Sequence, residues 1–324
     1  MDEPSAMEAY LDYGAATPMD PRVVDAMMPY LSERFWNPSA PYARAREAKR
    51  ALGEAHARLA RVIGARADSI TLTAGATEAN NLAFALTDGA VMVDAIEHES
   101  VLACAGVRPH VVVGVDTCGR VDPAAVAAAL TPEVGLVSMG LANGEIGTVQ
   151  PVREIARVVA KERRRRLEAG ERCSVWLHVD AAQAAGQLSV NVSSLGADLL
   201  TLSAAKVYGP KQVGLLWAAD GVELRPLVLG GGQEGGLRSG TENIAGAVAF
   251  ACALELAEKM RGQEWRRLCD LRDRMQGRLC ATFPWAWVSG PRTSRWRLPG
   301  LLHLSFPLRS EEHTSELQSL GRIS

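Results

Sequence analysis

The sequence has little net charge, no paired cysteine motif and no long apolar run. Its 324 residues carry a formal net charge of −2, which gives no electrostatic case for binding nucleic acid or a membrane surface. No apolar run reaches membrane-spanning length, and Met1–Pro4 has neither the basic nor the apolar region of a signal peptide. We therefore expect a cytosolic protein with no nucleic-acid partner and no membrane partner.

The six cysteines form no CxxC pair, and their spacing with the histidines matches no metal site. A disulfide framework is not expected in a chain of this length with so few cysteines, which also favours a reducing compartment. We predict no metal centre.

One basic segment, Lys161–Arg166, has the charge to suit a polyanion. A helix predicted to begin near Pro151 places this segment at the helix C-terminus, where the helix dipole favours positive charge. We therefore expect a solvent-exposed helix end rather than a binding site.

Short apolar runs alternate with helical segments along most of the chain. Hydrophobic residues make up 48% of the sequence, and its length allows one large domain and a smaller one. Most of the runs are continuously apolar, which is typical of a mostly parallel sheet covered by helices on both faces. The predicted strands are Ile70–Leu72, Val91–Val93, Val111–Val113, Gly135–Ser138, Val175–Val179, Asp198–Leu202 and Leu301–Pro307.

Apolar residues recur at helical spacing between these runs. The spacing predicts helices over Pro21–Met28, Ala43–Ile63, Thr77–Leu86, Ala245–Met260 and Trp265–Leu279, with Gly64 ending the second. The last two are expected as separate helices.

Three segments carry residues that suit a single cofactor. Asp180 follows an apolar strand, where a carboxylate can keep a pyridinium nitrogen protonated, and Lys206 follows the next strand, where an amine can form a Schiff base. The run Gly230–Thr241 offers flexible backbone and hydroxyl groups to a phosphate. In this order the segments predict a pyridoxal phosphate enzyme.

Two further segments offer contacts to the same cofactor. In Thr73–Glu78, the backbone at Ala76 and the Thr77 hydroxyl can approach an anion at a helix N-terminus, although an ordinary helix cap would give the same pattern. Gln183, one helical turn after Asp180, can hydrogen-bond a ring hydroxyl or simply lie on the surface.

His98 and Asn143 each lie just beyond a predicted strand. An imidazole at that place can stack on a cofactor ring and move protons, and an amide can hydrogen-bond the cofactor or the substrate. Taken alone, such a histidine is more often a surface residue near a helix start.

The chain resembles the class V aminotransferase-type family of cysteine desulfurases and selenocysteine lyases. The resemblance extends from about Tyr10 to Pro307 and includes the segments LDYGAATP, NPSAPYARAR, TAGATEANNLA, EHESV, LANGEIGTVQPV, HVDAAQAAG, SAAKVYGPK and GGGQEGGLRSGTEN. It implies an α/β fold of the aspartate aminotransferase type (fold type I), with a mostly parallel central sheet and a small domain.

The resemblance also implies residue roles. Lys206 would form the Schiff base, His98 would stack on the ring and relay protons, and Asp180 would contact the ring nitrogen. The other cofactor contacts implied are Ala76, Thr77, Asn143, Gln183, Ser203 and Thr241. Thr241 would reach the phosphate of a second subunit, so a homodimer is implied.

The implied reaction converts L-selenocysteine or L-cysteine to L-alanine and leaves selenium or sulfur, which a chalcogen-acceptor protein would receive. Tyr42 stands where cysteine desulfurases usually carry histidine, which favours selenocysteine lyase, with cysteine desulfurase as the alternative. A non-catalytic scaffold that binds the cofactor is an alternative of another class.

The sequence departs from the family at two places. Ala205 replaces the histidine that precedes the lysine in relatives, so we expect weaker cofactor binding. Relatives also continue after Pro307 with a loop cysteine and a carboxylate-binding arginine. Residues 309–324 here look like a translated sequencing adapter, so we expect a C-terminally truncated and impaired enzyme.

These features lead to an expected domain division. Residues 14–260 would form the large cofactor-binding domain, and residues 1–13 with 261–308 an incomplete small domain.

Overall fold

A computed structural model describes residues 9–171 and 173–306. The residues from 307 onward, including the segment 309–324, therefore lie outside the described residues, as do residues 1–8 of the expected small domain. The helices are α1 Pro21–Met27, α2 Pro29–Ser32, α3 Ala43–Ile63, α4 Ala76–Phe84, α5 Glu99–Gly106, α6 Pro123–Ala129, α7 Val152–Glu168, α8 Val192–Leu195 and α9 Ile244–Thr282. The strands are β1 Ile70–Thr73, β2 Ala90–Asp94, β3 His110–Val113, β4 Val134–Gly140, β5 Trp176–Asp180, β6 Leu199–Ser203, β7 Gly214–Ala218, β8 Trp287–Val288 and β9 Leu304–Ser305.

Within the described residues, the central sheet has seven strands in the order β1-β7-β6-β5-β4-β2-β3. Strands β6, β5, β4, β2 and β3 pair in parallel, whereas β7 is antiparallel to both of its neighbours. The expected α/β fold with a mostly parallel sheet is confirmed. Strand β7 was not predicted from the sequence.

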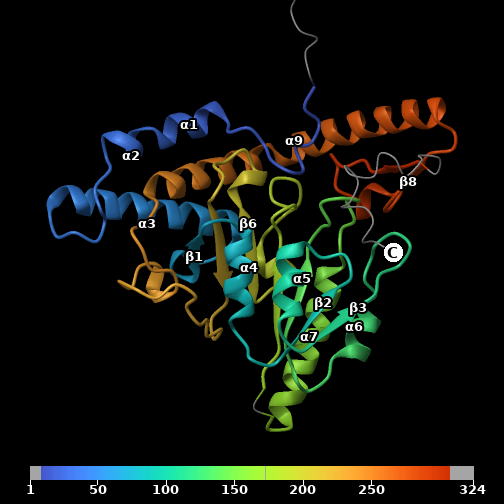
Figure 1. Cartoon of the computed structure of the whole chain (residues 1–324), viewed down its shortest axis with the longest axis horizontal. Coiled ribbons are helices and arrows are strands. Elements are labelled where there is room, and N and C mark those ends of the chain that lie inside the picture. The colour runs from blue at the N-terminus through green and yellow to red at the C-terminus, as the bar shows by residue number, and fades with distance from the viewer. Residues whose placement is uncertain (1–8, 172, 307–324) are drawn as a thin grey trace, which may run out of the picture.

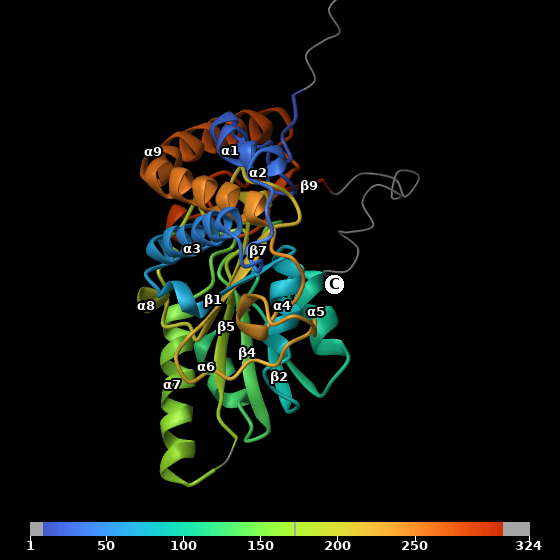
Figure 2. The ribbon, with the colours of Figure 1, turned by 90° about the vertical axis from the view of Figure 1, so that its left-hand side faces the viewer.

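Helices cover both faces of this sheet, with α4 and α5 on one side and α3 and α7 on the other (Figures 1 and 2). Neighbouring residues of one strand therefore face different cores. Val91 and Val93 of β2 pack with α4 and α5, while Met92 packs on the opposite face. This two-sided burial explains why the strands read as continuous apolar runs.

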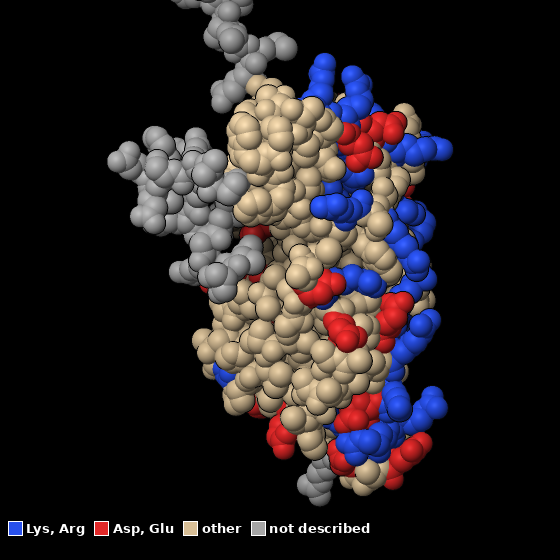
Figure 3. All heavy atoms as spheres, turned by 90° about the vertical axis from the view of Figure 1, so that its right-hand side faces the viewer, with Lys and Arg blue, Asp and Glu red and all other residues tan. Residues whose placement is uncertain are grey.

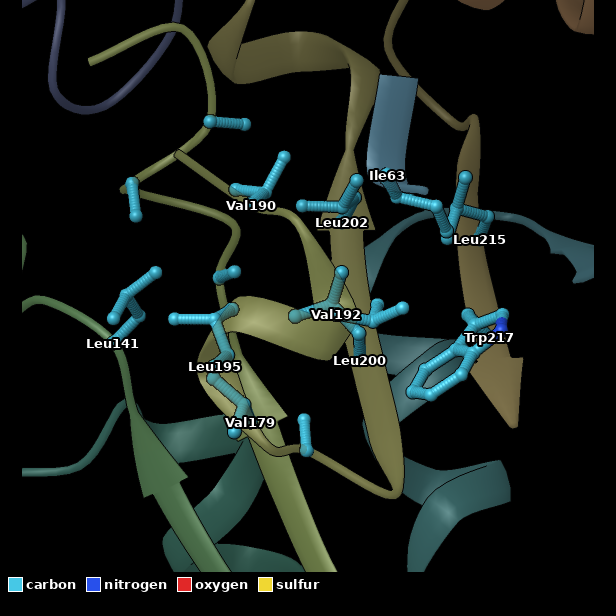
Figure 4. Packing of buried hydrophobic residues seen from close by; sticks show 14 of the residues in the cluster. Ile63, Leu141, Val179, Val190, Val192, Leu195, Leu200, Leu202, Leu215 and Trp217 are labelled. Atoms are coloured by element: carbon cyan, nitrogen blue, oxygen red, sulfur yellow. The ribbon is translucent and has the colours of Figure 1, made fainter. Parts of the chain in front are cut away.

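The larger core lies between the sheet and helices α3, α7 and α9. Figure 4 shows Leu200 and Leu202 of β6 beside Leu215 and Trp217 of β7, with Ile63 at the end of α3 above them. Helix α3 ends at Gly64, which has a left-handed backbone with φ of 71°. The predicted bounds of α3 are confirmed.

Helix α9 is one helix of 39 residues, so the prediction of two separate helices was wrong. No proline interrupts this segment, and Gly262 costs only about 1 kcal/mol within a helix. Ion pairs between Arg261 and Glu258 and between Arg267 and Glu264 support the helix through and beyond the expected break.

The predicted strand Leu301–Pro307 is mostly irregular. Only Leu304–Ser305 forms a strand, paired with Trp287–Val288, and Pro307 lies outside the described residues. A longer strand needs a longer hydrogen-bonding partner, and β8 has only two residues.

Among the described residues, no helix combines the length and the apolar character that crossing a membrane requires. Figure 3 shows Lys and Arg side chains along one edge of the molecule, interspersed with Asp and Glu.

The expectation that Lys161–Arg166 is a solvent-exposed helix end was partly wrong. Arg164 is exposed, but the Arg166 side chain is buried, with Nε donating to Glu162 Oε1 at 2.7 Å. Its Nη1 and Nη2 atoms donate to the carbonyl oxygens of Val134 and Thr131, each at 2.9 Å. Arg166 thus joins the end of α7 to the start of β4.

We predict that Arg166→Ala lowers the free energy of unfolding by about 3 kcal/mol, because it removes a buried guanidinium together with its ion pair to Glu162 and its hydrogen bond to the buried Val134 carbonyl. Chemical denaturation at pH 7 measures the loss. Arg164→Ala is the matched control on the same helix, with an expected change within about 0.5 kcal/mol. Equal losses in the two variants would contradict this role for Arg166.

Candidate active site

The candidate residues gather at the carboxyl-terminal edge of the parallel strands. Asp180 ends β5, Ser203 ends β6, and Lys206 follows within a short 3-10 turn, Ala204–Lys206. His98 follows β2 and caps α5, and Asn143 lies in the turn after β4. Open α/β sheets bind ligands at this edge.

The Asp180 carboxylate accepts two hydrogen bonds from its surroundings. Asn80 Nδ2 donates to Oδ2 at 2.7 Å, and the Ala182 backbone N–H donates to Oδ1 at 2.9 Å. Burial raises the pKa of Asp180, while these hydrogen bonds and the nearby His98 and Lys206 act in the opposite direction. A protonated ring nitrogen is the type of partner that such a carboxylate needs.

Two further carboxyl groups, Asp94 and Glu97, are buried near Asp180. Burial and the charges of Asp94 and Asp180 raise the pKa of Glu97 well above its usual value, which favours its neutral form. Burial raises the pKa of Asp94 to about 6. Glu97 also accepts a hydrogen bond from the Gly140 backbone N–H. These surroundings therefore disfavour a second negative charge beside Asp180.

The Lys206 amine contacts a segment near the N-terminus. Its Nζ donates to the carbonyl oxygens of Gly14 at 2.6 Å and Ala15 at 2.7 Å. Gln183 Nε2 donates to the same Gly14 oxygen at 3.0 Å. Burial lowers the pKa of Lys206, which favours the neutral amine that a nucleophile or base requires.

The N-terminus of α4 fits a phosphate group. Its cap residue Gly75 has φ of 111° and supplies no capping side chain, and Thr77 is exposed at the start of the helix. The first N–H groups of a helix need acceptors, and a phosphate at this position supplies them. Gly214 of β7 lies so close that a Cβ there would meet the Gly75 backbone at 2.5 Å. Glycine at 214 therefore allows the strand to pass beside this turn.

Asn143 organises its own loop. Its Oδ1 accepts hydrogen bonds from the Glu145 and Ile146 backbone N–H groups, and its Nδ2 donates to the Ile96 carbonyl at 2.8 Å. These contacts join the loop after β4 to the loop that carries His98. One N–H of the amide stays available to a ligand.

Thr241 is not brought together with the other candidates within one chain. Arg238 contacts Glu78 at 3.1 Å, so the glycine-rich run lies beside the start of α4. Thr241 itself is exposed and, within the described part of the chain, forms no hydrogen bond with another candidate residue. Its role towards a second subunit stays a prediction.

Sequence reasoning missed Asn80 and the backbone of Gly14 and Ala15. Asn80 is fully buried in α4, where an unpaired polar side chain is costly. The available signal was an asparagine on the core-facing side of the predicted helix. His178, in the same segment as Asp180, is a core residue. Burial lowers its pKa to about 3, and it hydrogen-bonds Ser138 and Thr201.

These residues fit pyridoxal phosphate. The uncapped start of α4 and the buried Ser203 suit the phosphate, and Asp180 suits the ring nitrogen. Lys206 follows β6, which is separated in the sheet from β1 and its phosphate turn by β7 alone, and both lie at the same edge. The described residues contain no group of three or more His, Cys, Asp or Glu side chains placed to hold a metal ion.

Comparisons with known proteins agree with this chemistry. The family model for "Aminotransferase class-V" matches residues 9–282. "Cysteine desulfurase IscS" of Dictyoglomus turgidum is 39% identical over 311 residues, which cover 92% of this chain and 76% of that protein.

Two solved structures are similar to the chain. One named "NIFS-LIKE PROTEIN" aligns with a TM-score of 0.87 and 31% identity, covering 97% of this chain and 85% of the other. A second, "SspA in complex with cysteine", aligns with a TM-score of 0.70 and 35% identity, covering 76% and 72% of the two chains.

The buried Asp94 gives a testable dependence of stability on pH. Its pKa in the folded protein is about 6, above the unfolded value, so its stabilising contribution is present below pH 4 and is lost as the pH rises through 6. The unfolding free energy of the wild type relative to Asp94→Asn should therefore fall between pH 4 and pH 7. Urea unfolding at several pH values measures it.

Asp220→Asn removes the same charge from an exposed position and serves as the control. A difference between wild type and Asp94→Asn that stays constant with pH would mean an unshifted pKa for Asp94, and one that grows with pH would mean a lowered pKa; either would contradict the prediction.

Proposed function

Because the chain belongs to the class-V aminotransferase family of pyridoxal phosphate enzymes, we propose that it is a cysteine desulfurase, which converts L-cysteine to L-alanine and releases the sulfur. The observation that carries the proposal is the assembly of Lys206, Asp180 and His98 at one sheet edge in a chain 39% identical to a protein named cysteine desulfurase. The solved relative in complex with cysteine supports the same substrate.

This choice reverses the order of the two substrates expected from the sequence. The selenocysteine lyase hypothesis was based on Tyr42. This residue is the N-cap of α3, its side chain is 49% exposed, and the side chain forms no capping hydrogen bond. The names of the relatives favour the cysteine desulfurase alternative.

The cofactor would be held by its phosphate at Ala76, Thr77 and Ser203 and by its ring nitrogen at Asp180. Bound there, pyridoxal phosphate withdraws electrons from the substrate carbon attached through its amine. Asp180 keeps the ring nitrogen positive, and Gln183 and Asn143 each keep one amide N–H for the ring oxygen or the substrate.

Lys206 acts first as the point of covalent attachment and then as the base. With its amine free, Lys206 would accept the proton from the substrate α-carbon. Burial lowers the pKa of this amine, which increases its neutral fraction near pH 7. His98, at the start of α5, acts as a proton donor to the site.

The assembly is part of the same proposal. Thr241 completes the phosphate site of a second subunit in a homodimer, and an acceptor protein receives the sulfur. The large domain comprises residues 14–260 and the small domain 1–13 with 261–308, so the boundary falls inside the continuous helix α9. The six free cysteines, all within the described residues, suit the cytosol.

We predict that the purified chain with added pyridoxal phosphate shows a visible absorption band, and that borohydride fixes the cofactor on Lys206. Lys206→Ala should abolish the covalent product, while Lys211→Ala, at a nearby lysine bound to the Thr17 carbonyl, should retain it. Absorption spectra and peptide mapping measure both.

Alanine formation from L-cysteine and from L-selenocysteine on one preparation then tests the substrate. Alanine from selenocysteine alone would restore the selenocysteine lyase hypothesis. Alanine from neither, with the absorption band intact, would favour the non-catalytic scaffold.

We predict that Ala205→His tightens pyridoxal phosphate binding about tenfold, the value of one hydrogen bond to a charged group. Ala205 is partly exposed between Ser203 and Lys206, and its carbonyl accepts from Thr17, so a larger side chain has room without loss of that contact. Fluorescence titration of the cofactor measures the affinity. Unchanged affinity would exclude a phosphate contact at this position.

A further inference from the structure

Asn80 contacts Asp180 directly and reaches His98 through Ser100. Its Nδ2 atom donates one hydrogen bond to Asp180 Oδ2 at 2.7 Å and another to Ser100 Oγ at 2.9 Å. The side chain is fully buried in α4, which lies beside α5 and its His98 cap (Figure 1). One amide group therefore connects α4, the helix that starts at the phosphate turn, with Asp180 and with the serine that contacts His98.

The orientation of the Asn80 amide is determined by its partners. The reversed amide would place its oxygen against the Asp180 carboxylate, which is repulsive. In the observed orientation Oδ1 is buried and has no hydrogen-bond partner among the described residues. Such a group reduces stability, so this asparagine is not explained by its contribution to the fold.

The Ser100 hydroxyl transmits the contact to His98. Because Ser100 Oγ accepts from Asn80, its own hydrogen is free to be donated to His98 Nδ1 at 2.8 Å. The Ser100 backbone N–H also donates to this nitrogen, at 3.1 Å. Two donors at Nδ1 place the ring proton on Nε2.

We propose that Asn80 is a positioning residue of the cofactor site, which holds the Asp180 carboxylate in place and, through Ser100, keeps His98 as the tautomer with its proton on Nε2. His98 then presents an N–H donor to the site and acts as a proton donor. The same side chain thus orients Asp180 directly and His98 through Ser100. The inference rests on the proposed cofactor site and not on the choice between cysteine and selenocysteine.

The test compares Asn80→Leu, which keeps the side-chain volume, with Ser100→Ala, which breaks only the branch to His98. Asn80→Leu should weaken pyridoxal phosphate binding about tenfold and shift the pH titration of the bound cofactor absorption, because Asp180 loses a hydrogen bond. Ser100→Ala should leave both unchanged. The titratable groups around Asp180 are His98, Lys206 and Glu97, and all three are present in both variants.

The second readout is the ¹⁵N resonance of His98, assigned with His98→Gln in labelled holoenzyme. Wild type should show the proton on Nε2. In both variants the Nδ1 resonance should move only part of the way towards that of an unbonded nitrogen, because the Ser100 backbone N–H still donates to it. Asn81→Leu is the matched control, because Asn81 is the exposed neighbour on α4 and bonds only the Thr77 carbonyl. It should behave as wild type in all measurements.

Several results would overturn the inference. A wild-type proton on Nδ1 would do so without any variant, even if Asn80→Leu fails to fold. A folded Asn80→Leu variant with wild-type affinity and titration would do so as well, and so would equal cofactor effects in Ser100→Ala. Absence of a cofactor band in wild type would instead reject the cofactor site itself.

Discussion

A carboxylate held at the end of a central strand is the constraint on which the site depends. Asp180 lies where burial disfavours its charge, so each neighbour contributes to keeping that charge. Asn80 and the Ala182 backbone donate to it, and Lys206 and His98 lie nearby. The raised pKa of Glu97 disfavours a second negative charge at the same place. The polar and charged groups at this edge of the sheet therefore surround one carboxylate, that of Asp180, in the absence of a ligand.

Much of the site could be predicted because its signals are local. Parallel strands end at one edge, so polar residues that directly follow apolar runs are brought together whatever the order of the strands. Asp180, Ser203, Lys206, His98 and Asn143 all follow such runs, and the structure places them at that edge. The family resemblance added their roles, which the structure leaves as proposals. The bounds of α3 were predictable for the same reason, since Gly64 and the apolar spacing are local.

The remaining features depend on contacts distant in sequence. Gly14 and Lys206 are 192 positions apart, and nothing near either one indicates the pairing. Asn80 looked like part of a helix start, and its partners come from two other elements. Strand β7 is as continuously buried as the parallel strands of the sheet, so its antiparallel direction could not be read from the sequence. In the sequence Arg166 is one charge in a basic run, whereas the carbonyl groups that accept its hydrogen bonds belong to Thr131, just before β4, and Val134, at its start.

The reversed direction of β7 also protects the outer strand β1. Because β7 ends at the opposite edge of the sheet from Lys206, the chain returns past β1 before α9 begins. On this return Glu234 accepts a hydrogen bond from the Leu72 backbone N–H at 2.8 Å. An outer strand with unpaired N–H groups is a template for pairing between molecules. The returning segment provides a partner for one of these N–H groups, which leaves less of the β1 edge open to pairing with another molecule.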